Sequence, residues 1–581
     1  MLCAPLVQGR GFRLDYLYTV AAEGNASGGH VAVRFDDIVY HFQHVDGGLI
    51  RLERDRIDNF QYHYRFLENR DIEAWRLGVD AATFFRLRDR FENRYQIQRL
   101  QFALAALLVQ EERWLSAIVT GKPVTMTIPG AGLFLTDSSV RARWRSPVLA
   151  GLAARLGNRA LDARIRQADT ALAHLTPVFW DAAGFRHSDQ DRVPSAPYAF
   201  SERYQDWFTR RLALQTLRQA RPLRPGVLRT ADIPAFRLSP SARAALCRLR
   251  GDLESRIGRL VATPRPDTGV ALFVLMARFV AAEHSCVSGR LAFLDRFRSD
   301  AEAVVLTDVE VDLGFWRAEM TRARNRLRKE LMAFARHGGR RYAALMAAAN
   351  RYDELRRGVE EGRPVRLFGI EPLPLRPLRL QRHVRLPVPA ARIEAVLTQV
   401  RRVRRFWQAV LRHWYRYRLL QRNCVTEVLR LLDVPVRFEK GEFMPFRSTR
   451  AVARHYTIQE RLSLPSYRHL RLRQAYRRAP AWRVYLREAN TLTATLYRPQ
   501  RDDSLFLFFT DDIFWARPLY GGINAAVALL STGAGLVTLP FDGGRLVRRG
   551  MLGVFSSLVE LGFGNVRKGS YRYLPPVSVS P

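Results

Sequence analysis

The spacing of apolar residues changes along the chain, and these changes predict its elements. Between residues 12 and about 66, apolar and polar residues alternate in short runs, which is typical of β-strands with one buried face. From 80 to 119 the apolar period becomes helical, and a long helical region rich in Arg, Ala and Leu follows. Proline-rich joints interrupt this region at 221–240, 262–269 and 371–389. The pattern predicts an α+β protein with a strand-rich start.

The C-terminal tail combines two apolar runs with a basic turn. The first run, from Pro518 to Phe541, has no formal charge and is long enough to span a bilayer, which needs about 20 residues. Arg545, Arg548 and Arg549 lie in the turn, and the second run is too short to cross. Two interpretations remain open. The tail is either a hairpin buried against the main domain or a hairpin that enters a membrane with its arginines at the headgroups.

The stretch SGGHVAVRFDDIVYHFQ, residues 27–43, predicts a β-hairpin with a histidine on each strand. With Asp36–Asp37 as a two-residue turn, Ala32 lies opposite His41. Side chains alternate along a strand, so His44 falls on the other face from His41. The polar residues expected to share one face are His30, His41 and Gln43. Such a face can hold an acid–base imidazole whose second nitrogen is oriented by a polar neighbour.

The four cysteines have neither the spacing of a disulfide framework nor that of a zinc site. Cys424 follows Asn423, a favourable N-cap, at the start of an amphipathic helix. There the helix dipole is expected to lower the thiol pKa from about 8.5. Cys247 has a mid-helix core position, Cys286 lacks a well-oriented neighbour, and Cys3 is terminal. Cys424 is therefore the candidate nucleophile, and a small core residue is the alternative.

The charge of the chain suits an anionic partner. Lys+Arg number 93 against 55 Asp+Glu, for a net charge of +38, and only four of the basic residues are lysines. The arginine skew is typical of a GC-rich genome, so only part of it bears on function. Anionic lipid and nucleic acid are both attracted to such a surface. No nucleic-acid-binding signature accompanies the charge, which favours lipid.

Three motifs in a fixed order resemble a known family. Gly29–His30 comes first, LENRDI at residues 67–72 second, and Asn423–Cys424 third. Together they resemble the Lnb N-terminal periplasmic domain family. That family is permuted papain-like and related to NlpC-type hydrolases and lecithin:retinol acyltransferase-like proteins. The similarity covers about 15–110 and 400–435. It implies an antiparallel sheet plus a nucleophile helix.

The resemblance also implies a mechanism. Cys424 would take an acyl group as a thioester, with His30 as base and acid and His41 as the orienting residue. Three further residues would orient the site or contact substrate, namely Gly29, Gln43 and Asn423. No cofactor or metal is expected. The implied partners are a phospholipid or acylated substrate, the membrane surface and a lipoprotein acceptor, and the implied reaction is N-acylation of bacterial lipoproteins.

The resemblance divides the chain into four regions. Residues 1–110 hold the histidine half of the core, and 396–515 hold the cysteine half. Residues 111–395 form a mostly helical insertion, and 516–581 form the apolar tail. The implied location is the cell envelope. The first residues lack the charged region and apolar core of a signal peptide, so the chain either stays inside or begins downstream of a leader.

Other functions remain open at this stage. An NlpC-type cysteine peptidase or amidase would use the same cysteine and histidine. A non-catalytic membrane scaffold would keep the fold with an unreactive Cys424, and a basic nucleic-acid binder is the remaining alternative. Asn69 and Arg70, between a strand and a helix, are expected to cap and pair rather than catalyse. The first oxyanion donor expected is the backbone N–H of Cys424, and the second is not identified.

Overall fold

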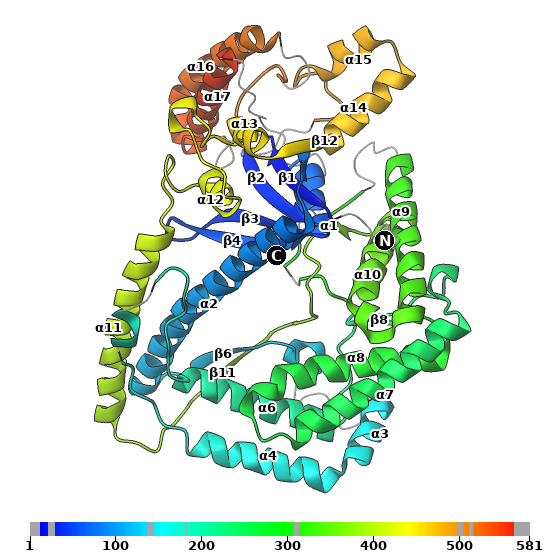
Figure 1. Cartoon of the computed structure of the whole chain (residues 1–581), viewed down its shortest axis with the longest axis vertical. Helices are drawn as coiled ribbons and strands as arrows, with labels where there is room; N and C mark the ends of the chain where they lie inside the picture. The colour runs from blue at the N-terminus through cyan, green and yellow to red at the C-terminus, as the bar shows by residue number, and fades with distance from the viewer. Residues whose placement is uncertain are drawn as a thin grey trace, which may run out of the picture. The chain divides into compact units, whose positions relative to one another are not determined.

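The computed structural model describes residues 12–562, apart from 21–28, 136–144, 182, 187–188, 299, 307–312, 498–502 and 511–514. Cys3 and the last part of the tail lie outside the described residues. The chain is α+β and forms two compact units (Figure 1). The first unit comprises residues 1–99 and 411–575, and the second comprises residues 100–410. Two long helices, α2 (Ala81–Val119) and α11 (Ala390–Tyr415), contain the boundaries between the units.

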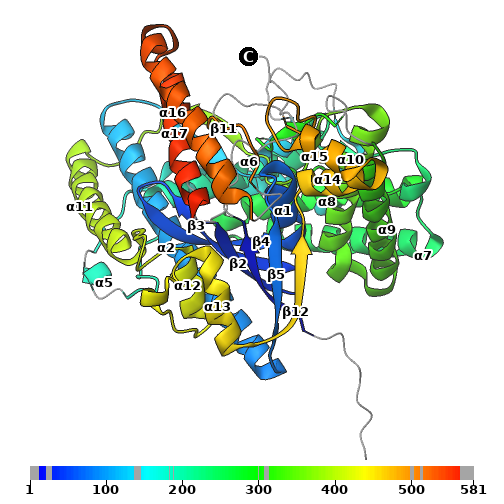
Figure 2. The same cartoon turned by 90° about the horizontal axis from the view of Figure 1, so that it is seen from above.

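The first unit contains a six-stranded antiparallel sheet in the order β12-β5-β1-β2-β3-β4. Figure 2 shows β12 beside β5, although the two strands come from opposite ends of the chain. Because β12 completes the sheet, the N-terminal and C-terminal parts form one fold. The strands are β1 (Leu14–Thr19), β2 (His30–Phe35), β3 (Ile38–Val45), β4 (Leu49–Arg56), β5 (Ile72–Gly78) and β12 (Thr457–Leu464).

The two faces of the sheet pack into separate cores. On one face, odd-numbered residues of β2 such as Val31 and Val33 meet α2 and the helix α12 (Cys424–Leu431). On the other face, Ala32 packs with α1 (Ile57–Gln61) and the π-helical turn η2 (Tyr62–Leu67). Both faces are covered, since side chains alternate along each strand and both sets are apolar.

The register of the first hairpin confirms the sequence prediction. Ala32 pairs with His41, and Phe35 pairs with Ile38 across the Asp36–Asp37 turn. Asp36 has a φ of 52°, a left-handed conformation that Asp tolerates better than most residues. The turn therefore fixes which side chains of β2 and β3 share a face.

The predicted strand character up to residue 66 is wrong for its last part. The chain leaves β4 at Arg56 and turns through α1 and η2. Ile57, Phe60 and Tyr64 are buried there, a spacing of three and four residues that suits a helix face. The helical period was present in the sequence, but the preceding alternation obscured it.

The second unit is mainly helical, with three two-stranded sheets that pair β6 with β11, β7 with β8 and β9 with β10. Its helices are α3 (Pro147–Leu156), α4 (Asn158–Ala173), α5 (Ala183–Arg186), α6 (Phe200–Arg218), α7 (Pro240–Ala262), α8 (Gly269–Ser288), α9 (Leu313–His337) and α10 (Tyr342–Glu361). Its strands are β6 (Val124–Ile128), β7 (Leu228–Arg229), β8 (Phe293–Leu294), β9 (Ala303–Val304), β10 (Val365–Arg366) and β11 (Leu378–Arg382).

A disulfide joins α7 to α8 in the second unit, contrary to the sequence prediction. Cys247 and Cys286 are bonded, with their Cα atoms 5.3 Å apart. The two residues are 39 positions apart on different helices, so neither a spacing motif nor local geometry signals the pair. Cys424 is the free cysteine of the described chain.

The remaining helices of the first unit follow the cysteine helix. They are α13 (Pro445–His455), α14 (Tyr467–Arg478), α15 (Ala481–Glu488), α16 (Arg517–Asp542) and α17 (Arg545–Leu561). The helices α16 and α17 lie side by side as a helical hairpin, as both views show (Figures 1 and 2). Small residues allow their close approach. A Cβ on Gly535 would lie 2.7 Å from the Val547 backbone N, and one on Gly550 would lie 2.9 Å from the Ala528 backbone O.

The apolar side chains of this hairpin point largely to the outside. Phe541 is 90% exposed, Val537 78% and Leu530 76%. Two described helical segments, Pro266–Ser288 and Arg517–Asp542, are long and apolar enough to cross a membrane, and 56% and 17% of their most apolar stretches are buried. The first segment is largely a core helix, whereas the second exposes its surface. Of the two interpretations of the tail, the buried hairpin does not fit this exposure.

Candidate functional site

A cavity of about 580 Å³ lies at the end of the sheet where β2 begins and β3 ends. It is within the first unit. Residues from both halves of the core line it, although some 390 positions of sequence separate them. The polar residues in its wall include His30, Gln43, Arg70, Asn423 and Cys424. The cavity therefore contains most of the residues that the sequence singled out.

Asn423 holds the start of the cysteine helix. Its Oδ1 accepts hydrogen bonds from the backbone N–H groups of Val425 and Thr426, both at 2.9 Å. Thr426 Oγ1 in turn accepts from the Asn423 N–H at 2.9 Å, which completes a capping box. The Asn423 Nδ2 donates to the backbone oxygens of Leu419 and Phe443. Asn423 thus fixes Cys424 in the first turn and ties that turn to two loops.

The Cys424 thiol is half-buried in the cavity wall, and its environment favours the protonated form. Burial raises its pKa to about 11, although backbone hydrogen bonds, with Val31 the strongest, and the charge of Arg70 act in the opposite direction. The expectation of a lowered pKa is wrong because the loss of solvation outweighs the helix terminus.

His30 and His41 form the centre of a hydrogen-bonded chain on one face of the hairpin. His30 Nε2 lies 3.0 Å from His41 Nδ1, and His41 Nε2 lies 3.3 Å from Asp55 Oδ2. The amide nitrogen of Gln43, which can only donate, lies 3.2 Å from the same His41 Nδ1. The predicted grouping of His30, His41 and Gln43 is confirmed.

This chain of contacts assigns the tautomers. The contact of the Gln43 Nε2 amide with His41 Nδ1 favours the tautomer in which His41 accepts at Nδ1 and donates from Nε2 to Asp55. His30 Nε2 must then donate to His41 Nδ1. The remaining nitrogen, His30 Nδ1, is left without a proton and is the one that can act as a base.

The His30 imidazole is neutral in this environment. Burial lowers its pKa well below 6.5, and the nearby His41 and the charge of Arg70 lower it further. Its ring stacks on Tyr64, with the centroids 5.5 Å apart. Gly29 precedes it at φ +87°, where a Cβ would lie 2.8 Å from the Tyr18 ring, so only glycine fits this approach.

His30 and Cys424 share the cavity without a direct hydrogen bond between them in the described chain. The His30 side chain lies on the face of the sheet that carries Tyr64, whereas the cysteine helix packs on the opposite face. Both line the cavity near the start of β2, where the Val31 N–H acts on the Cys424 sulfur. Catalytic hydrogen bonds are often longer without substrate, so the arrangement is compatible with a base and a nucleophile.

The LENRDI segment joins the two halves of the core. Asn69 Oδ1 accepts from the Arg468 N–H at 2.9 Å. Asp71 accepts from the Ser466 N–H and from His469 Nδ1, both at 2.6 Å. Pairing is therefore one role of this segment, as the sequence indicated.

Arg70 combines pairing with a position in the cavity wall. The side chain is 2% exposed, and its Nε and Nη1 donate to the Val20 backbone oxygen and to Glu68, each at 2.7 Å. Its Nη2 is buried and has no hydrogen-bond partner among the described residues. Its charge lowers the pKa of both Cys424 and His30. A fixed cation therefore acts on both candidate catalytic groups.

Glu68 stays ionised beside this arginine. Burial alone raises its pKa, but the hydrogen bond from His63 and the charge of Arg70 together bring it down to about 2. Glu68 thus balances part of the Arg70 charge and holds the guanidinium in place.

The sequence did not identify Asp55, Tyr64 or His44 as residues of this site. Asp55 lies on β4, whose Glu53 pairs with His41, so extending the predicted register to the next strand would have placed Asp55 beside that histidine. Tyr64 was assigned to a strand, and its position on η2 gave no usable signal. His44 was placed on the opposite face, yet the cavity extends around the strand end and includes it.

No protein-family model, curated protein or solved structure matches this chain.

Proposed function

We propose that the first unit is a permuted papain-like thiol enzyme, a membrane-associated acyltransferase or hydrolase that works through an acyl thioester on Cys424. The observation that carries this proposal is the cavity that both Cys424 and His30 line, with His30 backed by His41 and Asp55. The order of the motifs from Gly29–His30 to Asn423–Cys424, and their resemblance to the Lnb family, support the same function.

The proposed first half-reaction begins from a neutral pair. The Cys424 S–H proton passes to His30 Nδ1 as the sulfur attacks the carbonyl carbon of an ester. The bond between the carbonyl carbon and the alcohol oxygen breaks. His30 returns the proton to this departing oxygen. The acyl group remains on sulfur as a thioester. His41 and Asp55 stabilise the charged form of His30 that exists between these proton transfers.

The second half-reaction releases the acyl group. An amine, or water, attacks the thioester carbon and gives a proton to His30. The carbon–sulfur bond breaks, and the proton moves from His30 to sulfur, which restores the thiol. An amine acceptor makes the enzyme an N-acyltransferase, and the amino terminus of a bacterial lipoprotein is the acceptor that the Lnb resemblance suggests.

A phospholipid donor suits two features of the first unit. Arg70 lines the cavity, and its guanidinium group provides a fixed positive charge of the kind that recognises phosphate oxygens. The hairpin α16–α17 exposes apolar side chains, with Arg545 and Arg548 exposed near its turn. This combination is typical of an element that enters the lipid interface.

An extracytoplasmic location agrees with the disulfide of the second unit. Disulfides persist in oxidising compartments such as the bacterial periplasm and are rare in the cytosol. The bond between Cys247 and Cys286 therefore supports the proposed site of action in the cell envelope.

The test is acyl transfer from a labelled phospholipid to a lipopeptide with a free amino terminus. Cys424→Ala is expected to lower the rate roughly 10³-fold or more, because the thioester cannot form. Mass spectrometry should find the fatty acyl group on the Cys424 peptide of the unmodified enzyme. Full activity of Cys424→Ala would falsify the proposal. An acyl-enzyme formed only from peptide or amide donors would indicate the NlpC-type alternative.

A matched pair of histidine variants tests the base. His30 and His44 both line the cavity, but only His30 is bonded to His41. His30→Gln should remove most of the acylation rate, and His44→Gln should retain most of it. The opposite result would transfer the role of base to His44.

A further inference from the structure

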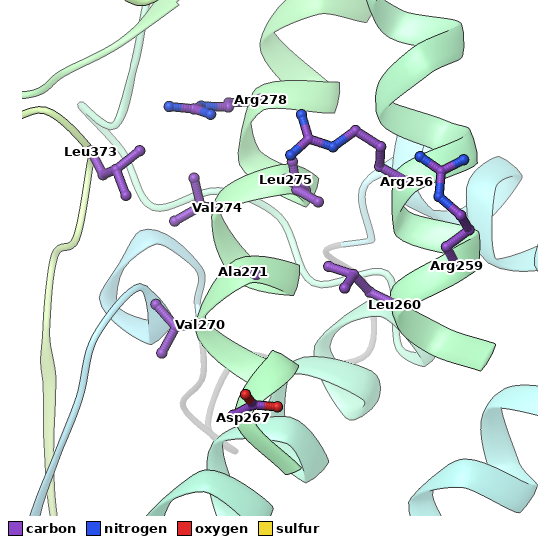
Figure 3. A pocket seen from close by; sticks show the side chains of 10 residues that line it. All are labelled: Arg256, Arg259, Leu260, Asp267, Val270, Ala271, Val274, Leu275, Arg278 and Leu373. Atoms are coloured by element: carbon purple, nitrogen blue, oxygen red, sulfur yellow. The ribbon is translucent and has the colours of Figure 1, made fainter. Parts of the chain in front are cut away.

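A second groove of about 580 Å³ lies in the second unit, between α7 and α8 (Figure 3). One face of helix α8 lines the groove. Val270, Val274 and Arg278 lie on this face because they are spaced four residues apart. Its apolar wall includes Leu260 of α7 as well. The disulfide between Cys247 and Cys286 joins the same two helices. The groove therefore has an apolar floor between covalently linked walls.

Three arginines line this groove, and two of them lie near one end. Arg256, Arg259 and Arg278 all line it, and none has a carboxylate partner in the described part of the second unit. In Figure 3, Arg256 and Arg278 lie near Leu275, whereas Asp267 lies at the other end, before the start of α8. Asp267 is already paired with Arg265. Positive charge is thus concentrated at one end of an apolar surface.

The positive charges at this end act on each other. Burial lowers the pKa of Arg278, Tyr342 raises it, and the charge of Arg256 lowers it, because the two guanidinium groups repel each other. The Arg278 guanidinium also lies over the Tyr342 ring, 5.8 Å from its centroid, which limits its freedom to move away. An anion between Arg256 and Arg278 would relieve this repulsion and accept hydrogen bonds from both.

We propose that this groove binds a single-chain amphiphile with an anionic head, a fatty carboxylate or an alkyl phosphate. The head lies between Arg256 and Arg278, and the chain lies along Val274, Leu275 and Leu260. The volume is within the range of ligand pockets, which are mostly apolar with a few polar groups that fix orientation. The two arginines set the direction, because Asp267 at the opposite end is paired with Arg265 and offers no free cation to the head. This site is separate from Cys424 and does not require its chemistry.

The binding test uses calorimetry on the full chain with dodecanoate, kept below its micelle concentration. Dodecyl phosphate should bind as well, because the head is recognised by charge. Dodecanol lacks the anion, and acetate and inorganic phosphate lack the chain, so each should bind at least about tenfold more weakly, which corresponds to about 1.4 kcal/mol. Equal binding of dodecanol and dodecanoate would overturn the assigned role of the arginines.

Variants separate this groove from other apolar surfaces. Ala271 is exposed and lines the groove, so Ala271→Trp should fill it and abolish dodecanoate binding. The double variant R256Q/R278Q should weaken dodecanoate about tenfold or more. The matched control is Arg248→Gln on the same α7, since Arg248 is exposed and does not line the groove.

The outcome of these variants decides the proposal. Dodecanoate binding that survives both Ala271→Trp and R256Q/R278Q would overturn it and would assign the ligand to another surface, such as the α16–α17 hairpin. Cys424→Ala should bind dodecanoate with unchanged affinity. If Cys424→Ala also keeps full acyl-transfer activity, the proposed function fails while the groove stands, so the two proposals can fail independently.

Discussion

A half-buried thiol and a half-buried imidazole that are both uncharged differ from a thiolate–imidazolium pair. Such an ion pair reacts with electrophiles at neutral and mildly acidic pH. In this protein burial raises the pKa of Cys424 and lowers that of His30, so the neutral pair is the resting state. Proton transfer then has to accompany attack on the substrate. In the proposed reaction, attack by Cys424 therefore depends on a bound ester, which limits its reaction with other compounds.

The pH dependence of Cys424 alkylation tests this state. With a thiol pKa of about 11, the thiolate fraction and the rate of reaction with iodoacetamide should rise about tenfold per pH unit between pH 7 and 10. An ordinary thiol levels off above about pH 8.5. Peptide mass spectrometry in a Cys3→Ser background measures the rate at Cys424. A plateau between pH 5 and 7 would instead indicate a thiolate–imidazolium pair.

Sequence analysis located the main residues of the site but not their electrostatics. The alternation rule placed His30, His41 and Gln43 together because a two-residue turn leaves one register, and the cap residue Asn423 marked the helix start. The raised pKa of Cys424 could not be predicted from the sequence, because desolvation depends on how residues far apart in sequence pack around the sulfur. The position of Asp55 near His41 could have been predicted, because β3 and β4 are neighbours in sequence and pair directly.

At the scale of elements, the α16–α17 hairpin stands out because its exterior is more apolar than its contact surface. Glycines at the contact let the two backbones approach, and the larger apolar side chains are on the outside. Apolar patches of this kind on a protein surface mark an interaction site. A bilayer suits the two exposed arginines near the turn, since anionic headgroups attract them.

We expect a charge on the outer surface of this hairpin to weaken membrane binding. The double variant L530D/V537D should reduce sedimentation with phosphatidylglycerol vesicles by about tenfold or more, because carboxylates are costly in the apolar layer. The control is Leu492→Asp, since Leu492 is 83% exposed and lies outside the hairpin. Equal loss of binding in both variants, or no loss in either, would contradict a specific role for the hairpin.

Among the elements, the longest periodic segments were the most predictable. The helix over 81–119 and the β2–β3 hairpin follow their apolar patterns. The segment 57–67 was not predicted correctly. A strand-like alternation and a helical spacing of apolar residues meet there, and the segment packs on one face of the sheet. The pairing of β12 with β5 has no local signal at all, since the partner of an edge strand is chosen by the whole fold.

At the scale of the molecule, the two units differ in their covalent constraints. The second contains the Cys247–Cys286 disulfide, and the described part of the first has a free thiol. A disulfide of this loop length is expected to contribute about 2–4 kcal/mol. C247S/C286S should therefore lower the melting temperature of the full chain, whereas Cys424→Ser should leave it nearly unchanged.

Free thiol titration of protein exported to the periplasm, with and without reductant, should differ by two groups per chain.

The pairing of β12 with β5 also has a consequence in time. Chains are synthesised from the N-terminus at about 5–20 residues per second, and β12 follows β5 by about 380 residues, so β5 waits roughly 20–80 s for its partner. During that interval one edge of the sheet offers unpaired backbone groups to any other strand. Several ribosomes that translate one messenger RNA would bring the unpaired β5 edges of several nascent chains close together. Production of this protein should therefore depend on a chaperone that covers the nascent N-terminal segment until the last strand arrives.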